Sequence, residues 1–164
     1  MGSKSIAMGK PIGCAVLLVG DERQAPSGQL LVKLLEEAGH TITQDRTIKP
    51  DGLQIKGELA MLTQSQSSQA IFFTGRTGNA LRDPIGDAVR QQLDRRLDGF
   101  GDLLRSLLYQ QQGSHAMLAQ GVAGSIKRKM VFCLPGELDI IELAMTKLVL
   151  PELEQLLDQM IPRA

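Results

Sequence analysis

The stretch Cys14-Ala-Val-Leu-Leu-Val-Gly-Asp21 decides the fold class, together with the segment Gly28-Gln-Leu-Leu-Val-Lys-Leu-Leu-Glu-Glu-Ala-Gly39 that follows it. Residues 14–19 form an unbroken apolar run of the length of a buried strand, and Gly20 and Asp21 end it. Residues 28–38 have the apolar spacing of an amphipathic helix, which Gly39 terminates. A buried strand followed by a helix is one unit of an α/β fold.

The rest of the chain continues this alternation. Strands are expected at residues 41–48, 70–73 and 129–134, and helices at 53–63, 87–97, 102–112, 115–120 and 142–160, the last interrupted near Pro151. Short apolar strands that alternate with helices predict a mostly parallel sheet with helices on both faces. We therefore expect one α/β domain at residues 14–164, preceded by a flexible leader at residues 1–13.

Composition excludes several classes of protein. The 164 residues carry 18 basic and 18 acidic side chains and only five aromatic residues, which argues against nucleic-acid binding by phosphate neutralisation or base stacking. The apolar run 15–19 is far too short to span a membrane. Cys14 and Cys133 lie apart in apolar runs, which favours two reduced core thiols over a metal or redox site. We expect a soluble, cytoplasmic protein that binds neither nucleic acid nor a membrane.

Three of the expected strands are followed by loops that contain glycine. These loops are Gly20-Asp21, Thr74 to Gly78, and Pro135-Gly136. Ligands of open α/β sheets bind beyond the carboxyl ends of the strands. We therefore expect the three loops to converge on one site.

The loop Thr74-Gly75-Arg76-Thr77-Gly78 has the composition of an anion site. Glycines let backbone N–H groups approach a phosphate, a threonine hydroxyl adds a donor, and Arg76 and the nearby Arg82 add charge-assisted bonds. The pattern matches neither the Walker nor the dinucleotide fingerprint. A tight turn without a ligand is the alternative interpretation.

Asp51 and Asp83 are candidate metal ligands, because each follows an expected strand or its loop. Two carboxylates together with substrate phosphates are the ligands that Mg²⁺ prefers. Asp51 is also a good turn residue between Pro50 and Gly52, and Asp83 could cap the helix that follows it. Asp21 would be a third acid at the same edge, with turn capping as its alternative.

The ordered set of motifs resembles the MoaB/Mog family of molybdenum cofactor biosynthesis proteins over about residues 14–160. The motifs that carry the resemblance are Gly20-Asp21, Pro26-Ser27-Gly28, Glu37-Ala38-Gly39-His40, Pro50-Asp51, Thr74-Gly75-x-Thr77-Gly78 with Arg82-Asp83, Gly99-Phe100-Gly101, Val122-Ala123-Gly124 and Leu134-Pro135-Gly136. An ordered set of this kind is far more specific than any one of its motifs.

The resemblance implies a three-layer αβα sandwich that assembles as a homotrimer or hexamer and binds molybdopterin, with other proteins of the pathway as further partners. Active members of the family use ATP and Mg²⁺ to transfer AMP to the terminal phosphate of molybdopterin, releasing pyrophosphate. Asp51 and Asp83 match the family acids associated with metal, nucleotide and catalysis. The implied substrate-binding residues are Asp21, Ser27, Gly28, Thr74, Gly75, Arg76, Thr77, Gly78, Arg82 and Gly136.

The chain departs from the family pattern at several positions. Arg76 replaces a glycine of the phosphate loop, Ala119-Gln120 replaces Ser-Arg, and Glu137-Leu-Asp139 follows Pro135-Gly136 where the family carries no acids. Three hypotheses follow. The first is an active adenylyltransferase, and the second is a catalytically impaired relative that binds a pterin or a partner protein. The third is a related nucleotide-binding domain with another substrate.

Overall fold

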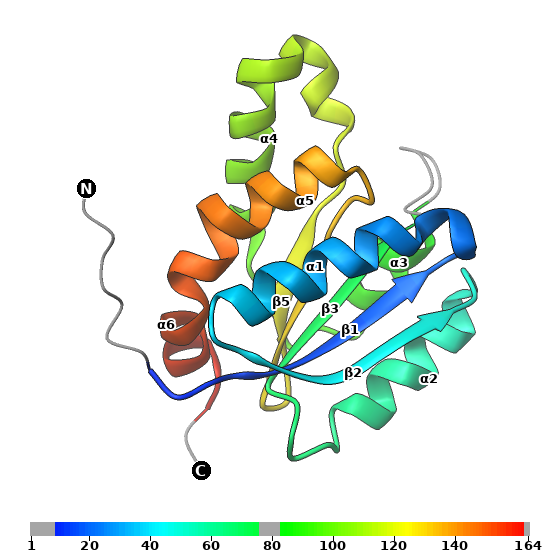
Figure 1. Cartoon of the computed structure of the whole chain (residues 1–164), viewed down its shortest axis with the longest axis vertical. Helices are drawn as coiled ribbons and strands as arrows, with labels where there is room; N and C mark the ends of the chain where they lie inside the picture. Colours follow the sequence, from blue (N-terminus) through cyan, green and yellow to red (C-terminus); the bar gives the residue numbers. More distant parts are fainter. Residues whose placement is uncertain (1–8, 76–82, 163–164) are drawn as a thin grey trace.

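The computed structural model describes residues 9–75 and 83–162 as a twisted sheet with helices on both faces (Figure 1). The strands are β1 (Gly13–Val19), β2 (Thr41–Ile48), β3 (Ala70–Gly75), β4 (Arg95–Arg96), β5 (Val122–Ile126) and β6 (Lys129–Cys133). The α-helices are α1 (Ala25–Glu37), α2 (Gly52–Leu62), α3 (Pro84–Arg90), α4 (Asp98–Gln112), α5 (Leu138–Ala144) and α6 (Leu150–Met160). Short 3₁₀ turns η1 (Glu22–Gln24) and η2 (Gly113–Leu118) and a π-helical turn η3 (Met145–Val149) complete the list.

The sheet is mixed and mostly parallel, with strand order β2-β1-β3-β6-β5-β4. Strands β2, β1, β3 and β6 are parallel, whereas β5 runs antiparallel to β6 and β4 runs antiparallel to β5. The carboxyl ends of the four parallel strands therefore lie at one edge of the sheet. The start of β5 comes to the same edge, because Val122 pairs with Cys133 at the end of β6.

Alternating side chains of the strands build two separate cores. Along β1, Cys14 and Val16 belong to the core beneath α1, α4, α5 and α6, and Leu17 belongs to the core beneath α2 and α3. Phe132 is fully buried in the first core and stacks on Phe72, with ring centroids 5.1 Å apart. The expected three-layer αβα sandwich is confirmed. Among the described residues, no helix combines the length and apolar character needed to cross a membrane.

The edge strands β4 and β5 differ from the sequence prediction. The helix expected at residues 87–97 is wrong at its second half, because α3 ends at Arg90 and residues 95–96 pair with β5. Residues 122–126 were not expected to form a strand, since Val-Ala-Gly-Ser-Ile is neither strongly apolar nor alternating. Their glycine has a packing reason: a Cβ on Gly124 would lie 2.3 Å from the carbonyl oxygen of Arg95.

Helix boundaries near the end of the chain also shift. Helix α5 begins at Leu138, four residues before the expected helix start at residue 142. The π-helical turn η3 then joins it to α6, where Pro151 lies in the first turn. The helix runs on from η3 into α6, and the π-helical turn, in which the Leu150 N–H donates to the Met145 carbonyl, changes the hydrogen-bond register directly before the proline.

Candidate functional site

The candidate site lies at the edge where the parallel strands end and where helices α1, α2, α3 and α5 begin (Figure 1). Helices α1 and α5 pack together on one face of the sheet, and α2 and α3 pack together on the other. Helix N-termini present unpaired N–H groups and a partial positive charge. An edge to which several N-termini contribute is suited to an anionic ligand.

The last residues of β1 and β3 and the loop after β6 lie against one another through backbone atoms. Gly75 has φ +121°, and a Cβ on it would lie 2.3 Å from the carbonyl oxygen of Val19. A Cβ on Gly136 would lie 2.3 Å from the carbonyl oxygen of Gly75. Both positions therefore require glycine, one for its backbone conformation and both for close approach. The predicted convergence is seen between Gly75 and Gly136, whereas residues 76–78 of the second loop lie outside the described residues.

Two hydroxyl groups hold this junction together. The Ser27 hydroxyl at the start of α1 donates to the carbonyl oxygen of Gly136 at 2.6 Å, and the buried Thr74 hydroxyl donates to the carbonyl oxygen of Pro135 at 3.3 Å. The neighbouring Gly28 is less constrained, because a Cβ there would make only ordinary contacts with Leu18 at 3.6 Å. Ser27 and Thr74 thus have a structural role, and their binding of a substrate stays a prediction.

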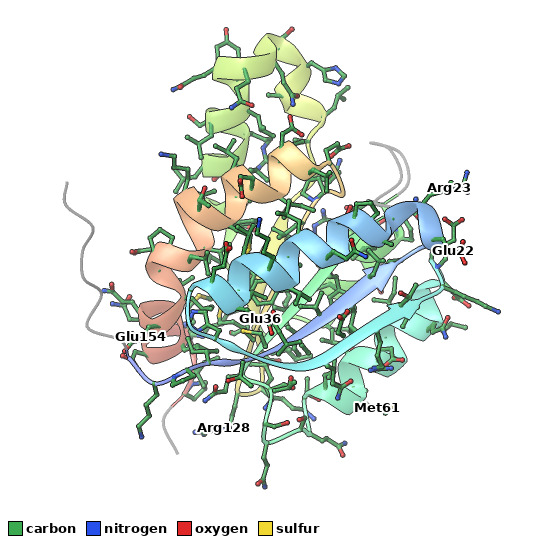
Figure 2. All side chains as sticks on the ribbon, in the orientation of Figure 1. Glu22, Arg23, Glu36, Met61, Arg128 and Glu154 are labelled. Carbon is green, nitrogen blue, oxygen red and sulfur yellow. The ribbon has the colours of Figure 1, made fainter. Side chains whose placement is uncertain are left out.

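The turn after β1 is organised by Asp21. Its carboxylate accepts the backbone N–H of Arg23 at 3.0 Å and forms an ion pair with the Arg23 guanidinium at 2.9 Å. Gln24 completes a capping box by accepting the backbone N–H of Asp21 at 2.7 Å. Figure 2 shows Glu22 and Arg23 pointing away from the body of the molecule. Turn capping, the alternative role of Asp21, is therefore present, and its contact with a substrate stays a prediction.

Asp51 and Asp83 occupy equivalent positions at the starts of the two packed helices α2 and α3. Asp51 is exposed, and its Oδ1 accepts the backbone N–H of Leu53 at 3.0 Å. Asp83 is 7% exposed, and its Oδ1 accepts the backbone N–H of Gly86 at 2.9 Å. Both residues are helix caps, which is the alternative role expected for Asp83, whereas a turn was the alternative expected for Asp51. Each cap uses Oδ1, so the second carboxylate oxygen lies outside the capping bond.

Asp83 has an unusual electrostatic environment. Burial raises the pKa of its carboxyl group, and nearby Asp87 raises it further, against the lowering effects of the Gly86 N–H group and the Arg90 guanidinium. Arg90 Nη2 lies 3.9 Å from Asp83 Oδ2. A Cβ on Gly86 would lie 2.1 Å from Asp83 Oδ2, so a side chain at this position would displace the Asp83 carboxylate. The molecule therefore keeps a partly desolvated carboxylate at the site, with one arginine to oppose its charge.

Asp51 and Asp83 are of the ligand type that a magnesium ion shared with a substrate would use. Mg²⁺ is usually held by one or two carboxylates together with phosphates and water. Within residues 9–75 and 83–162, no group of three or more His, Cys, Asp and Glu side chains could hold a metal alone. Asp51 and Asp83 would be the protein ligands of such an ion, and phosphate oxygens would have to supply the rest.

Four predicted binding residues, Arg76, Thr77, Gly78 and Arg82, lie outside the described residues. Their contacts with a phosphate stay predictions. The structure does describe the residues that depart from the family pattern. Glu137 and Asp139 are exposed at the start of α5, where Asp139 Oδ1 accepts the N–H of Ile140 at 3.1 Å. Their negative charges stabilise the N-terminus of α5 and compete with an anionic ligand for that N-terminus.

Two residues near Asp83 were not among the predicted binding residues. Gln120 lines a narrow crevice together with Asp83 and Cys133. Arg90 approaches the Asp83 carboxylate from the last turn of α3. The spacing of Asp83 and Arg90 contains the signal for this contact, because residues seven apart lie on one face of a helix. The sequence prediction missed it because it placed the helix at residues 87–97, which excludes Asp83.

The family "Probable molybdopterin binding domain" matches residues 15–155 of the chain. The chain belongs to this family. Molybdenum cofactor biosynthesis protein B of Halalkalibacterium halodurans is 35% identical over 156 residues, which cover 93% of this chain and 92% of that protein. The protein of the same name from Bacillus cereus is 38% identical over 148 residues, which cover 88% of each.

Solved structures agree with this assignment. A crystal structure of molybdenum cofactor biosynthesis protein B superposes with a TM-score of 0.86 at 36% identity and covers 92% of this chain and 96% of its own. The tungsten cofactor synthesizing protein MoaB of Pyrococcus furiosus has a TM-score of 0.82 at 21% identity, with 94% and 100% of the two chains covered, and supports the fold. The chain is thus a MoaB-like protein of molybdenum cofactor biosynthesis.

The junction of the three loops predicts a strong effect of Gly136→Ala. Because the new methyl group would meet the Gly75 carbonyl, we expect the free energy of unfolding to fall by about 1–3 kcal/mol in urea denaturation. Gly99→Ala is the matched control, since nothing lies within 4 Å of its Cβ, and should leave stability unchanged or raise it by up to about 1 kcal/mol. Equal effects of the two substitutions would contradict the packing argument.

The buried carboxylate predicts that Asp83→Asn does not destabilise the fold at neutral pH. Asparagine caps a helix as well as aspartate does, and it removes the cost of burying a charge. Because the pKa of Asp83 is raised in the folded chain, this cost is absent below the ordinary pKa of aspartate and complete above the raised one. Thermal melts should show a Tm advantage of the variant that grows from pH 3 to pH 7. A Tm clearly below wild type at pH 7 would show that Asp83 stabilises the fold.

Proposed function

We propose that the chain binds molybdopterin and catalyses its Mg²⁺-dependent adenylylation by ATP, with release of pyrophosphate. The observation that carries this proposal is the pair Asp51 and Asp83 at the starts of two packed helices, beside a junction of glycine loops at the carboxyl edge of the sheet. Membership of the molybdopterin-binding family supports molybdopterin as the substrate. The two aspartates at helix N-termini suit a nucleotide whose phosphates share a cation with the protein.

The reaction needs positioning and charge neutralisation more than a covalent nucleophile. A terminal phosphate oxygen of molybdopterin attacks the α-phosphorus of ATP and forms a new P–O bond. The bond from the α-phosphorus to the bridging oxygen breaks, and pyrophosphate leaves with its electron pair. Bound Mg²⁺ would offset negative charge on the phosphates, while Asp51 and Asp83 hold it and the helix N-termini orient the oxygens.

The burial of Asp83 supports a ligand-binding role. A carboxylate with a raised pKa costs stability in the free protein. A cation bound next to it would reverse that cost and favour the ionised form. A cap that served the helix alone could be the asparagine discussed above, at no such cost.

The activity test is pyrophosphate release from ATP in the presence of Mg²⁺ and molybdopterin. Asp51→Asn and Asp83→Asn should each lower kcat/KM by about 100-fold or more, because each removes a charged ligand of the cation that would neutralise the reacting phosphates. Asp158→Asn, an exposed aspartate on α6, is the control and should retain wild-type activity. Background pyrophosphate release by the wild-type protein would overturn the enzymatic proposal.

A second candidate is a relative that binds molybdopterin without catalysis. It is favoured by the exposed acids Glu137 and Asp139 at the start of α5 and by Ala119-Gln120 beside the Asp83 crevice. Calorimetry separates the two candidates. Binding of molybdopterin with no binding of ATP and Mg²⁺ would support the second, and binding of both would support the first.

We also propose that the chain assembles as a homotrimer or a hexamer. Helix α4 and the turn η2 project beyond the layers (Figure 1) and expose the large apolar side chains of Leu103, Tyr109, Met117 and Leu118, which are available for contact with other copies of the chain. Light scattering should give a mass of about 53 kDa, three times the 17.8 kDa of one chain, or twice that. Tyr109→Asp should lower the mass and Leu53→Asp, on exposed α2, should not. A 17.8 kDa species for wild type would contradict assembly.

A further inference from the structure

A pocket of about 390 Å³ lies between α3, α4, β4 and β5, beside the candidate site. Three arginines from three different elements line it: Arg90 from α3, Arg96 from β4 and Arg105 from α4. Asp98 and Asp102 are the carboxylates among its lining residues. The lining therefore carries three guanidinium groups and two carboxylates, and Asp87, outside the lining, pairs with Arg90.

Glycines shape the floor of the pocket around Arg105. A Cβ on Gly101 would lie 3.0 Å from Arg105 Nη2 and from the carbonyl oxygen of Gly121, so the guanidinium lies close to α4 at a position without a side chain. Arg105 Nη2 donates to Asp102 Oδ1 at 3.0 Å, and Nη1 donates to the carbonyl oxygen of Ala119 at 3.5 Å. These contacts hold the guanidinium in place at the pocket before any ligand arrives.

Arg90 and Arg96 each make a hydrogen bond to a neighbouring aspartate. Arg90 Nη1 donates to Asp87 Oδ1 at 2.9 Å, and Arg96 donates from Nε to Asp98 Oδ1 at 3.1 Å. The Arg96 bond uses the donor nearest the stem, which leaves its terminal N–H groups to a ligand. Arg90, Arg96 and Arg105 are 30%, 58% and 37% exposed, so all three are accessible from solvent.

We propose that this pocket binds a phosphate-type oxyanion, either inorganic phosphate or pyrophosphate. Guanidinium groups present forked donors that match the oxygens of a phosphoryl group. Three guanidinium groups around one cavity could therefore contact several oxygens of one bound anion. The pocket adjoins the proposed reaction site, because Gly121 and Val122 line both it and the crevice at Asp83. Arg90 lies between the two, near both Asp83 and Asp87.

The inference does not depend on the proposed reaction. Binding of an inorganic anion is measured without nucleotide or pterin, so a protein that lacks adenylyltransferase activity would still show it. If the reaction does occur, the pocket offers a place for the leaving pyrophosphate next to Asp83. In that case, pyrophosphate should bind more tightly than phosphate, since it can reach more than one arginine.

The test is calorimetric titration of the full chain with inorganic phosphate and with inorganic pyrophosphate at constant ionic strength. Arg96→Gln should weaken binding of the tighter anion about five- to tenfold, because it removes a charge-assisted bond at a partly exposed site. Arg95→Gln is the matched control: it removes the same charge from the neighbouring residue of β4, which does not line the pocket. It should change affinity less than twofold.

Two results would overturn the proposal. Wild-type protein that shows no saturable binding of either anion lacks the site. Equal weakening by Arg95→Gln and Arg96→Gln would show general electrostatic attraction and no pocket.

Discussion

The contact of three strand ends through bare backbone is the constraint on which the rest of the site depends. Gly75 at the end of β3 lies against the Val19 carbonyl of β1, and Gly136 after β6 lies against the carbonyl of Gly75. No residue with a side chain can replace either glycine without moving a strand end. Once the strand ends meet, α1 and α5 must begin side by side, and the Ser27 hydroxyl reaches the Gly136 carbonyl. Backbone packing at these glycines therefore sets the geometry of the site.

Electrostatics then divides the edge into regions of different sign. Buried Asp83 places a costly carboxylate at the start of α3, and Arg90 opposes it from the end of the same helix. Exposed Glu137 and Asp139 lie at the start of α5 on the opposite face of the sheet. The arginines around the neighbouring pocket provide the positive charge. A balanced net charge for the whole chain is compatible with this strong local contrast.

The sequence predicted the parallel half of the sheet and the loops that end its strands, because long apolar runs and glycines leave clear patterns. It did not predict β5. The backbone of Arg95 lies too close to Gly124 for a side chain there, and a glycine in the middle of a short strand weakens its apolar pattern. It also extended the helix at residues 87–97 over β4, since two-residue strands have no periodicity of their own. Asp51 and Asp83 were found as candidates, but burial of one and exposure of the other depend on tertiary packing. The same limit explains why Arg90 and the arginine pocket were missed: the three guanidinium groups come from different elements.

The central claim is that Asp83 is kept as a buried carboxylate because a cation and phosphates bind beside it. The most direct measurement is an NMR titration of the Asp83 side-chain carboxyl carbon, first in the free protein and then with ATP and Mg²⁺. The account predicts a pKa above the ordinary aspartate value in the free protein, because burial dominates, and a clear decrease when the ligands bind. A pKa that stays the same in both states would contradict the account and leave Asp83 as a helix cap alone.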